Sequence, residues 1–503
     1  MNSARQLRTQ IITRIAARPT VFALAAVILL GVWIRTYHFS APIADTHFFR
    51  QTQTAGTVWI WDRFGFDFTG YRVNVFGGGH WVLELPTYQT VVFALVKVFG
   101  FHEELGRVVS IAAYVIGSVL LYAIGRRVLE SRLGALVAVT MFSLMPILVF
   151  YYRAFHIDPF TITMALGLIY ALLRFSEGSA WRWWSLAAVL LPLVMLTKAT
   201  IFLAFALPAA SLALRGLQRR GRDWRLWPAS ISVFLTSCLI LLLWTRHGDR
   251  LNAQSSGNTF NGAWDWYFGS TLTNLETYQT ILDRFSSNLQ WLGWLLVALG
   301  AGRILFGQFA YRRELGLLVL SNFMALVVFA NLNNIHDYYQ LPWYVALSLL
   351  AGLGAAWLRG LAPRADIRTI STATAGVLIT LGVAYRAELV HGYFNPITFS
   401  QDTVNFGELI GRTTPEGHRV IIVGASVDPS NPATLFFARR IGWEIPSVNA
   451  TQFEKAAAGD PKLGAVVVIK GGAPIPAHVL KVVAFRHFKT TYDDANVTVF
   501  RAP

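Results

Sequence analysis

Charged residues are scarce in this sequence of 503 residues. Asp, Glu, Lys and Arg together make up 14% of the chain, whereas a typical soluble domain has about 25%. Hydrophobic residues make up 54%, and they fall into long runs. This composition excludes a chain of soluble domains and predicts a polytopic membrane protein.

Cysteine is almost absent. Cys238 is the single cysteine and lies inside an apolar run, which excludes an intrachain disulfide, a cysteine zinc site and an iron–sulfur cluster. Acidic residues are also few, with 27 Asp and Glu against 43 Lys and Arg, a net charge of +16. In a soluble chain this surplus would suggest nucleic acid. Here the arginines lie mostly in short loops between apolar runs, where they set topology, so nucleic acid is not an expected partner.

Eleven apolar runs predict membrane spans. The first follows a basic N-terminus, which also fits a signal peptide cleaved near residues 41–44, but the many later spans favour a retained helix. The predicted spans are 20–34, 108–125, 133–150, 159–173, 183–197, 200–214, 227–245, 289–306, 315–332, 341–358 and 370–386. The least certain division is within 183–214, which reads as two short helices that meet at Thr197 and Lys198.

The arginine-rich loops follow the even-numbered spans. By the positive-inside rule these loops are cytoplasmic, so the N-terminus is cytoplasmic and the C-terminus lies outside, in the periplasm. The apolar run at 91–99 is too short to cross the membrane as a helix, and Lys97 interrupts it. We therefore interpret it as an interfacial or re-entrant helix within one long outer loop, residues 37–106.

The C-terminal residues differ in character from the rest. We predict a membrane domain over 1–387 and a small α/β domain outside the membrane over 388–503. Its strand-like runs alternate with helical stretches such as 402–411. These runs are 419–426, 464–470, 482–488 and 497–501, the last two flanking a turn at Asp493-Asp494. The segment VGAS lacks the glycine spacing of a dinucleotide site.

Unusual polar residues gather on the predicted outer side. Four segments supply them, and together they suggest one polar cavity at the outer interface, because ionisable groups near membrane depth usually face a cavity or one another. The candidates are Asp45, His47, Arg50, Gln51 and Glu84 in the first outer loop, Arg153 and Asp158 after the third span, Lys198 between spans five and six, and His336, Tyr338 and Tyr339 after the ninth span.

A structural role is an alternative to the functional role for these candidates. Carboxylates supply a general base or metal ligands, and Arg or Lys would hold a phosphate. However, Asp45, Glu84 and Asp158 could each cap a helix, and Lys198 could extend its ammonium group to the interface. A divalent metal ion held by Asp45, His47, Glu84 and His336 is left open.

Several segments together resemble the GT-C superfamily of integral-membrane glycosyltransferases. The resemblance is strongest to the branch of protein O-mannosyltransferases and lipid A aminoarabinose transferases. The segments that carry it are DTHFFRQTQTA (45–55), ELPTYQ (84–89), GRVVS (106–110), YYRAFHIDPF (151–160), LTKAT (196–200) and IHDYYQLP (335–342). They cover roughly residues 20–360 in order.

This resemblance implies a GT-C helix bundle that transfers a sugar from a polyprenyl-phosphate donor to an acceptor outside the cytoplasmic membrane. Asp45 falls at the family's catalytic acidic position and would deprotonate the acceptor, and Glu84 falls at the second acidic position. Lys198 and the Arg50 region would hold the donor phosphate. Thr46 follows Asp45 where the family often has adjacent acidic residues, so acceptor chemistry or metal use could differ. Phe49 replaces a Trp of the bacterial members, a change that we expect to keep the aromatic packing.

The sequence leaves the sugar open, and the acceptor could be a lipid, a glycan or a protein. The main alternative is a transporter or flippase for a lipid-linked substrate. That class predicts polar residues in both leaflets and usually an inverted repeat. The polar residues here lie on one side and no repeat is visible, which favours the enzyme.

Overall fold

The structure is a computed structural model, and it describes residues 20–178, 181–220, 224–255, 269–361 and 401–503. The chain divides into two compact units. The helical unit comprises Met1–Phe39, Arg107–Leu243 and Gly262–Tyr393, and the mixed unit comprises Ser40–Gly106, Trp244–Asn261 and Phe394–Pro503.

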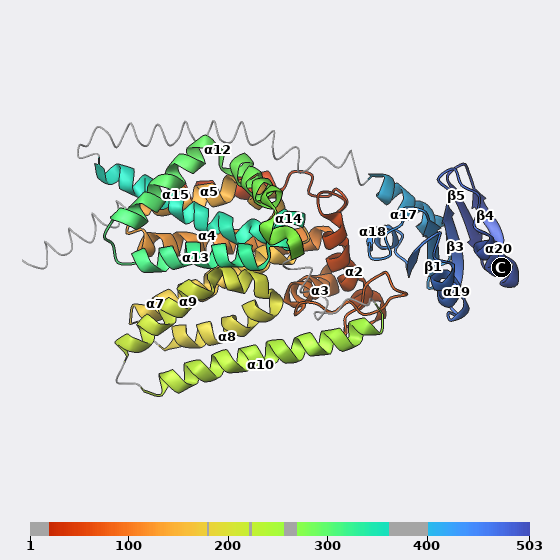
Figure 1. Cartoon of the computed structure of the whole chain (residues 1–503), viewed down its shortest axis with the longest axis horizontal. Helices are drawn as coiled ribbons and strands as arrows, with labels where there is room; N and C mark the ends of the chain where they lie inside the picture. Colours follow the sequence, from red (N-terminus) through yellow and green to blue (C-terminus); the bar gives the residue numbers. More distant parts are fainter. Residues whose placement is uncertain (1–19, 179–180, 221–223, 256–268, 362–400) are drawn as a thin grey trace, which may run out of the picture. The chain divides into compact units, whose positions relative to one another are not determined.

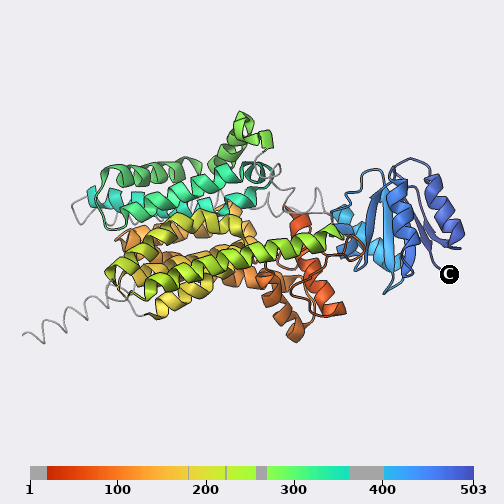
Figure 2. The same cartoon turned by 60° about the horizontal axis from the view of Figure 1, so that its bottom comes forward.

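Long apolar helices form the helical unit (Figure 1). After a first helix, Thr20–Arg35, the elements are α4 Glu104–Val128, α5 Arg132–Leu144, α6 Pro146–Tyr151, α7 Ile157–Ser176, α8 Arg182–Thr197, α9 Ala199–Arg219, α10 Leu226–Ala253, the 3-10 helix η2 Gly269–Thr273, α12 Leu275–Phe306, α13 Arg312–Val328, α14 Ala330–Ile335, the 3-10 helix η3 Asp337–Gln340 and α15 Leu341–Leu361. Helices α7, α8 and α9 lie side by side, as do α12 and α15 (Figure 2).

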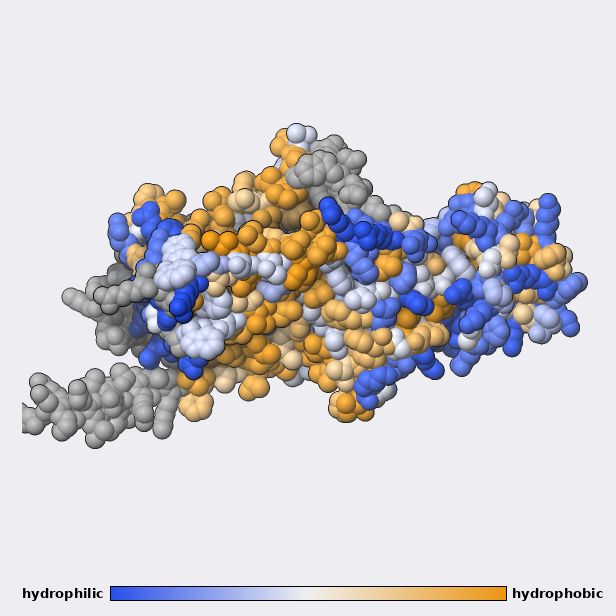
Figure 3. Space-filling model, turned by 90° about the horizontal axis from the view of Figure 1, so that it is seen from below, coloured by the Kyte–Doolittle hydropathy of each residue, from blue (hydrophilic) through white to orange (hydrophobic). Residues whose placement is uncertain are grey.

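Six of the described helices are long and apolar enough to cross a membrane, and four shorter apolar helices accompany them. Figure 3 shows a broad apolar surface over the helices and a mainly hydrophilic surface over the C-terminal residues. The predicted multi-pass membrane protein is thus confirmed. The predicted span at 370–386 lies outside the described residues.

Two predicted spans are interrupted in the structure. The run at 133–150 is not one helix, because Met145 is extended and Pro146, which has no N–H to donate, starts the separate helix α6. The run at 315–332 likewise divides between α13 and α14 at Phe329. The predicted break at Thr197-Lys198 is confirmed, since Lys198 is extended between α8 and α9.

The mixed unit begins with the long loop and two helices. Helix α2 (Phe48–Phe64) buries most of its residues, and α3 (Thr87–Phe99) is the short helix predicted at the end of the loop. Trp61, Tyr71 and Val82 form a small core with Phe93 and with the end of α10.

The C-terminal residues of the mixed unit form a five-stranded sheet between helices. The elements are α17 Gln401–Thr413, β1 Arg419–Gly424, α18 Ala433–Phe437, β2 Ile441–Pro446, α19 Ala450–Ala458, β3 Leu463–Ile469, α20 Ala477–Phe485, β4 Lys489–Asp493 and β5 Val497–Arg501. The strand order is β2-β1-β3-β5-β4. Strands β1, β2 and β3 are parallel, and β4 and β5 form an antiparallel pair.

The predicted small α/β domain is therefore present, with one correction. The run at 482–488 is not a strand, because residues 482–485 end helix α20, and the strand lies further along at β4. Alternate valines of α20, Val479 and Val483, face the core beneath the sheet. The adjacent residue Val482 also packs against this core, whereas adjacent residues of a strand point to opposite faces.

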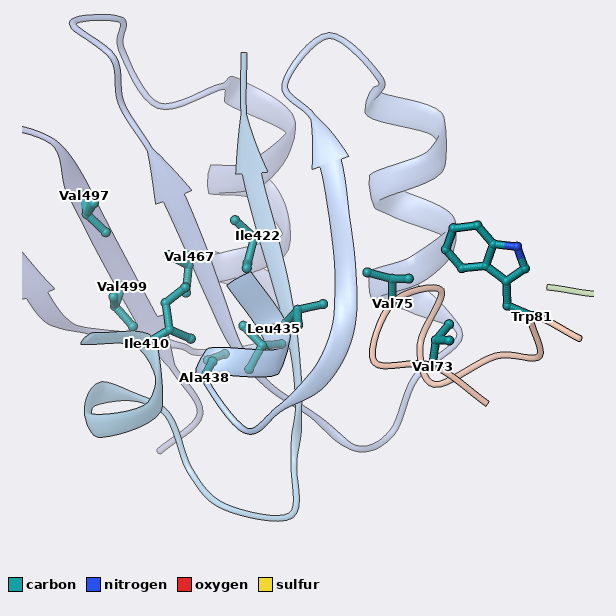
Figure 4. Close-up of a cluster of buried hydrophobic side chains, with 12 residues drawn as sticks. Val73, Val75, Trp81, Ile410, Ile422, Leu435, Ala438, Val467, Val497 and Val499 are labelled. Atoms are coloured by element: carbon teal, nitrogen blue, oxygen red, sulfur yellow. The ribbon is translucent and has the colours of Figure 1, made fainter. Parts of the chain in front are cut away.

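Part of the outer loop packs on this sheet. Val73, Val75 and Trp81 share a core with Ile422 of β1 and with helices α17 and α18 (Figure 4). The mixed unit thus joins the loop to the C-terminal residues in one compact body.

Candidate functional site

Asp45 lies at the entrance to α2. Its carboxylate is almost buried, with 8% of the residue exposed. The side-chain amide of Gln51 donates to Asp45 Oδ1 at 2.5 Å and to the carbonyl of Thr46 at 3.1 Å. His47 is in the left-handed region with φ of 55° and is the N-cap residue of α2, where its side chain does not make the capping hydrogen bond. The backbone turn at His47 brings Asp45 back beside the first turn of α2, where Gln51 contacts it.

Arg50 and Glu84 form an ion pair in the same unit. Arg50 also donates to Gln53 Oε1 at 2.6 Å. The hydroxyl of Tyr71 donates to the carbonyl of Glu84 at 3.0 Å and accepts from the N–H of Leu83 at 2.7 Å. Burial, with the nearby Glu84 carboxylate, raises the pKa of Tyr71 above its ordinary value, so the hydroxyl stays a donor. The segment that carries Glu84 is therefore held on both sides.

A second group of ionisable residues lies in the helical unit. Lys198 Nζ donates to Asp158 Oδ2 at 2.7 Å, and His156 Nδ1 lies 3.0 Å from the same oxygen. All three side chains are buried, with 0% to 4% exposed. Asp158 Oδ1 has no hydrogen-bond partner within the part of the chain that the structure describes. Asp158 is at the first turn of α7, next to the cap His156, where a negative charge is also favourable to the helix dipole.

Aromatic rings surround this lysine. Lys198 Nζ lies 5.0 Å from the ring centre of Tyr338 and 4.7 Å from that of Tyr339. His336 stacks on Tyr338 with ring centres 4.9 Å apart, and Tyr151 donates to Asp337 at 2.5 Å. The structure thus brings the predicted residues Asp158, Lys198, His336, Tyr338 and Tyr339 together.

Arg153 holds the end of the first helix. Its guanidinium is buried and donates to the carbonyl of His38 at 2.6 Å. The sequence interpretation missed two further buried arginines, Arg35 and Arg107. Arg107 donates to the carbonyl of Phe39, and Arg35 donates to three backbone carbonyls. Arg107 lies in GRVVS, one of the segments that carry the family resemblance. The sequence therefore pointed to this segment but not to the contact that Arg107 makes.

A small pocket adjoins Tyr339 between α9, α13, α14 and α15. Four of its polar side-chain atoms are buried and lack hydrogen-bond partners among the described residues, which suits a single bound water. These atoms are Thr200 Oγ1, Asn322 Oδ1, Asn333 Oδ1 and Trp343 Nε1. The sequence interpretation singled out none of them, because amides and hydroxyls are common in membrane helices.

The predicted residues therefore fall into two groups. Asp45, His47, Arg50, Gln51 and Glu84 belong to the mixed unit, and Arg153, Asp158, Lys198, His336, Tyr338 and Tyr339 belong to the helical unit. The single shared cavity stays a prediction. Among the described residues, no three His, Cys, Asp or Glu side chains are grouped so that they could hold a metal ion. The metal ion at Asp45, His47, Glu84 and His336 also stays a prediction.

Residues 86–245 match the sequence model of the family described as dolichyl-phosphate-mannose-protein mannosyltransferase. No curated protein sequence matches the chain.

Solved structures match over nearly the whole chain. ArnT from Cupriavidus metallidurans, bound to undecaprenyl phosphate, is similar with a TM-score of 0.60 and 15% identity, over 95% of this chain and 97% of that one. Its apo form gives a TM-score of 0.61 and 15% identity, over 96% and 98%. The oligosaccharyltransferase AglB from Archaeoglobus fulgidus, in complex with an inhibitory peptide and a dolichol-phosphate, gives 0.52 and 11% identity, over 89% of this chain and 69% of that one.

These similarities span both units, since each solved structure covers about nine tenths of the chain or more. The chain therefore has the GT-C fold, and its resemblance to the integral-membrane glycosyltransferases of that superfamily, in the branch of protein O-mannosyltransferases and lipid A aminoarabinose transferases, is confirmed.

Proposed function

We propose that this chain transfers a hexosyl or pentosyl group from a polyprenyl-phosphate donor to an acceptor at the outer face of the cytoplasmic membrane. The observation that carries the proposal is the buried Asp45 carboxylate, held by Gln51 at the start of α2, in a chain with the GT-C fold. The similar ArnT structure contains undecaprenyl phosphate, and the similar AglB structure contains dolichol-phosphate. Both are polyprenyl phosphates of the kind proposed here.

Asp45 is the proposed base. It takes the proton from the acceptor hydroxyl while the acceptor oxygen bonds to the anomeric carbon of the sugar. The bond between that carbon and the phosphate oxygen breaks, and polyprenyl phosphate leaves with the electron pair. The hydrogen bond from Gln51 to Oδ1 orients the carboxylate that would accept the proton. General-base assistance of this kind contributes about 10²–10⁴-fold to rate.

Arg50 and Lys198 are the proposed cations for the donor phosphate, because charge that develops on the leaving group is stabilised by fixed positive groups. Each of them already contacts a carboxylate, Glu84 and Asp158 respectively. These contacts hold the cations in fixed positions before the donor arrives. They also pair each carboxylate with a cation, so that neither carboxylate is left without an opposite charge beside the phosphate. The tyrosines beside Lys198 would line the sugar or the first part of the lipid chain.

The predicted topology agrees with this chemistry. A donor lipid stays in the bilayer, and the residues proposed to act on it follow spans that end on the predicted outer side. The N-terminus would be cytoplasmic and the C-terminal sheet periplasmic. A reporter fused near Glu103 should then be active outside, and a cytoplasmic signal there would break the register of spans.

Mass spectrometry of envelope glycans and lipids from a deletion strain tests the function and identifies the product. The expected result is loss of one sugar from a lipid, glycan or protein, restored by the wild-type chain but not by Asp45→Asn. Loss of the same sugar together with accumulation of the lipid-linked sugar on the inner leaflet, rather than on the outer leaflet, would support a flippase.

A further inference from the structure

The segment that leads into Asp45 is attached to Glu103. The backbone N–H of Ile43, two residues before Asp45, donates to Glu103 Oε2 at 2.9 Å. Ile43 is fully buried, so this hydrogen bond fixes a buried part of the backbone. Glu103 lies at the far end of the same loop, just before α4.

The other oxygen of Glu103 is bound from the C-terminal sheet. Arg439 Nη2 donates to Glu103 Oε1 at 2.7 Å. The guanidinium is itself held between two rings, with its centre 4.3 Å from that of Phe436 and 5.0 Å from that of Phe101. Hydrogen bonds between two charged groups are among the stronger ones in proteins. Arg439, Glu103 and Ile43 thus form a continuous chain that ends two residues from Asp45.

Arg439 adopts a backbone conformation that serves this contact. Its φ is 53°, in the left-handed region that residues with a Cβ rarely adopt. Such a conformation persists where the surroundings determine it. The next residue, Arg440, fixes this turn by donating to the carbonyls of Gly411 and Thr414 at 2.8 Å each.

A second attachment reaches α2, the helix that follows Asp45. Asn74 in the loop exchanges backbone contacts with the edge strand β2, since Gly442 N donates to its carbonyl at 2.9 Å and its side chain donates to the carbonyl of Arg440 at 3.0 Å. Asn74 also packs closely against α2, because a Cβ placed on Gly56 would lie 2.2 Å from Asn74 Oδ1. The C-terminal residues therefore hold the chain on both sides of Asp45.

We propose that residues 401–503 position the Asp45 carboxylate for transfer, and that Glu103 and Arg439 are the positioning residues that couple them. This inference rests on the proposed function, because it assigns the coupling to the proposed base. The C-terminal sheet then contributes to turnover without touching the donor. Loss of the contacts between Arg439, Glu103 and Ile43 should let the segment before Asp45 move. Small displacements of a catalytic group lower rates by up to about a hundredfold.

The test uses the full-length protein in detergent and in membranes. Arg439→Ala and Glu103→Ala remove the contact between Arg439 and Glu103, and Arg439→Lys keeps a positive charge with N–H donors. Arg412→Ala is the matched control, because Arg412 forms a similar ion pair with Glu408 at 2.7 Å in the same sheet domain but on its exposed surface. Three readouts are compared: hydrogen exchange of the amides in 41–47, turnover to the product identified in the deletion strain, and affinity for undecaprenyl phosphate.

Both Ala variants should speed exchange in 41–47 at least tenfold. They should also lower turnover by about tenfold to a hundredfold. Undecaprenyl phosphate affinity should stay unchanged, Arg439→Lys should recover part of both losses, and Arg412→Ala should resemble wild type. Unchanged hydrogen exchange and turnover in the Ala variants would overturn the proposal. A joint fall of turnover, lipid affinity and unfolding temperature would also overturn it, because that pattern indicates general destabilisation. A failure of the proposed function is distinguishable, because Asp45→Asn would then keep its turnover while the exchange of 41–47 still depended on Arg439.

Discussion

Lys198 and Asp158 are buried partners, with Nζ 2.7 Å from Oδ2 and Tyr338 and Tyr339 beside the ammonium group. They come from the junction of α8 with α9 and from the first turn of α7. One pair therefore ties two membrane helices together and places a cation among aromatic rings. Its structural contribution and its proposed contribution to substrate binding are separable by mutation.

Lys198→Ala should destabilise the protein by about 3–5 kcal/mol, because it leaves Asp158 buried without its cation. The double variant Asp158→Asn/Lys198→Gln removes both charges and should recover most of that stability. It should not recover undecaprenyl phosphate binding, since each lost charged hydrogen bond contributes about 1.5–3 kcal/mol. Thermal unfolding and lipid binding in detergent measure the two effects. A double variant that binds the lipid like wild type would make the pair purely structural.

Helices α5 and α15 approach each other through glycines. A Cβ on Gly352 would lie 2.3 Å from the carbonyl oxygen of Gly134, and small residues permit such close packing in membrane helices. Gly352→Ala should therefore lower the unfolding temperature clearly. Gly360→Ala on the same helix is the control, because a Cβ there meets none of the described residues within 4 Å. Equal unfolding temperatures for the two variants would contradict the close packing.

Glu444 makes the stability of the C-terminal sheet depend on pH. It is buried on β2, its Oε1 lacks a hydrogen-bond partner among the residues that the structure describes, and burial raises its pKa to about 8. The folded state then holds a proton that the unfolded state releases above its ordinary pKa of 4.5. Stability should fall as pH rises from about 4.5 to about 8.

Glu444→Gln removes this titration and should flatten the decline. Unfolding followed between pH 4.5 and 9, for wild type and variant, gives the comparison. The two curves should coincide at the acidic end and diverge as pH rises, with the variant more stable. Parallel curves over the whole range would show that Glu444 is ionised in the folded protein.

Much of the fold could be predicted because it depends on local pattern. Apolar runs of sufficient length gave the helices, and the extended Lys198 was foreseen from a polar residue within a long apolar stretch. The break at Pro146 was readable from its missing N–H but was overlooked. Strand β4 was misplaced because its residues are mostly exposed, so the neighbouring apolar run, which belongs to α20, gave the stronger signal.

The sequence named candidate site residues but not their pairings, and the roles of those residues stay predictions. Asp45, Glu84 and Lys198 were recognisable as costly polar groups near membrane spans. The contact of Arg439 with Glu103 joins residues 336 positions apart, and nothing in either local segment marks the other. Only the tertiary packing of the loop on the C-terminal sheet selects that partner.

The most direct test of the account is the turnover of Asp45→Asn, measured with the product identified in the deletion strain and at donor concentrations where transfer limits the rate. Asparagine keeps the size of the side chain and a hydrogen-bonding oxygen for Gln51, but it is not a base. We expect turnover to fall by about 10²–10⁴-fold while undecaprenyl phosphate affinity and yield of folded protein stay near wild type. A variant that retains more than about a tenth of wild-type turnover would contradict the role of Asp45 and move it to Glu84 or Asp158.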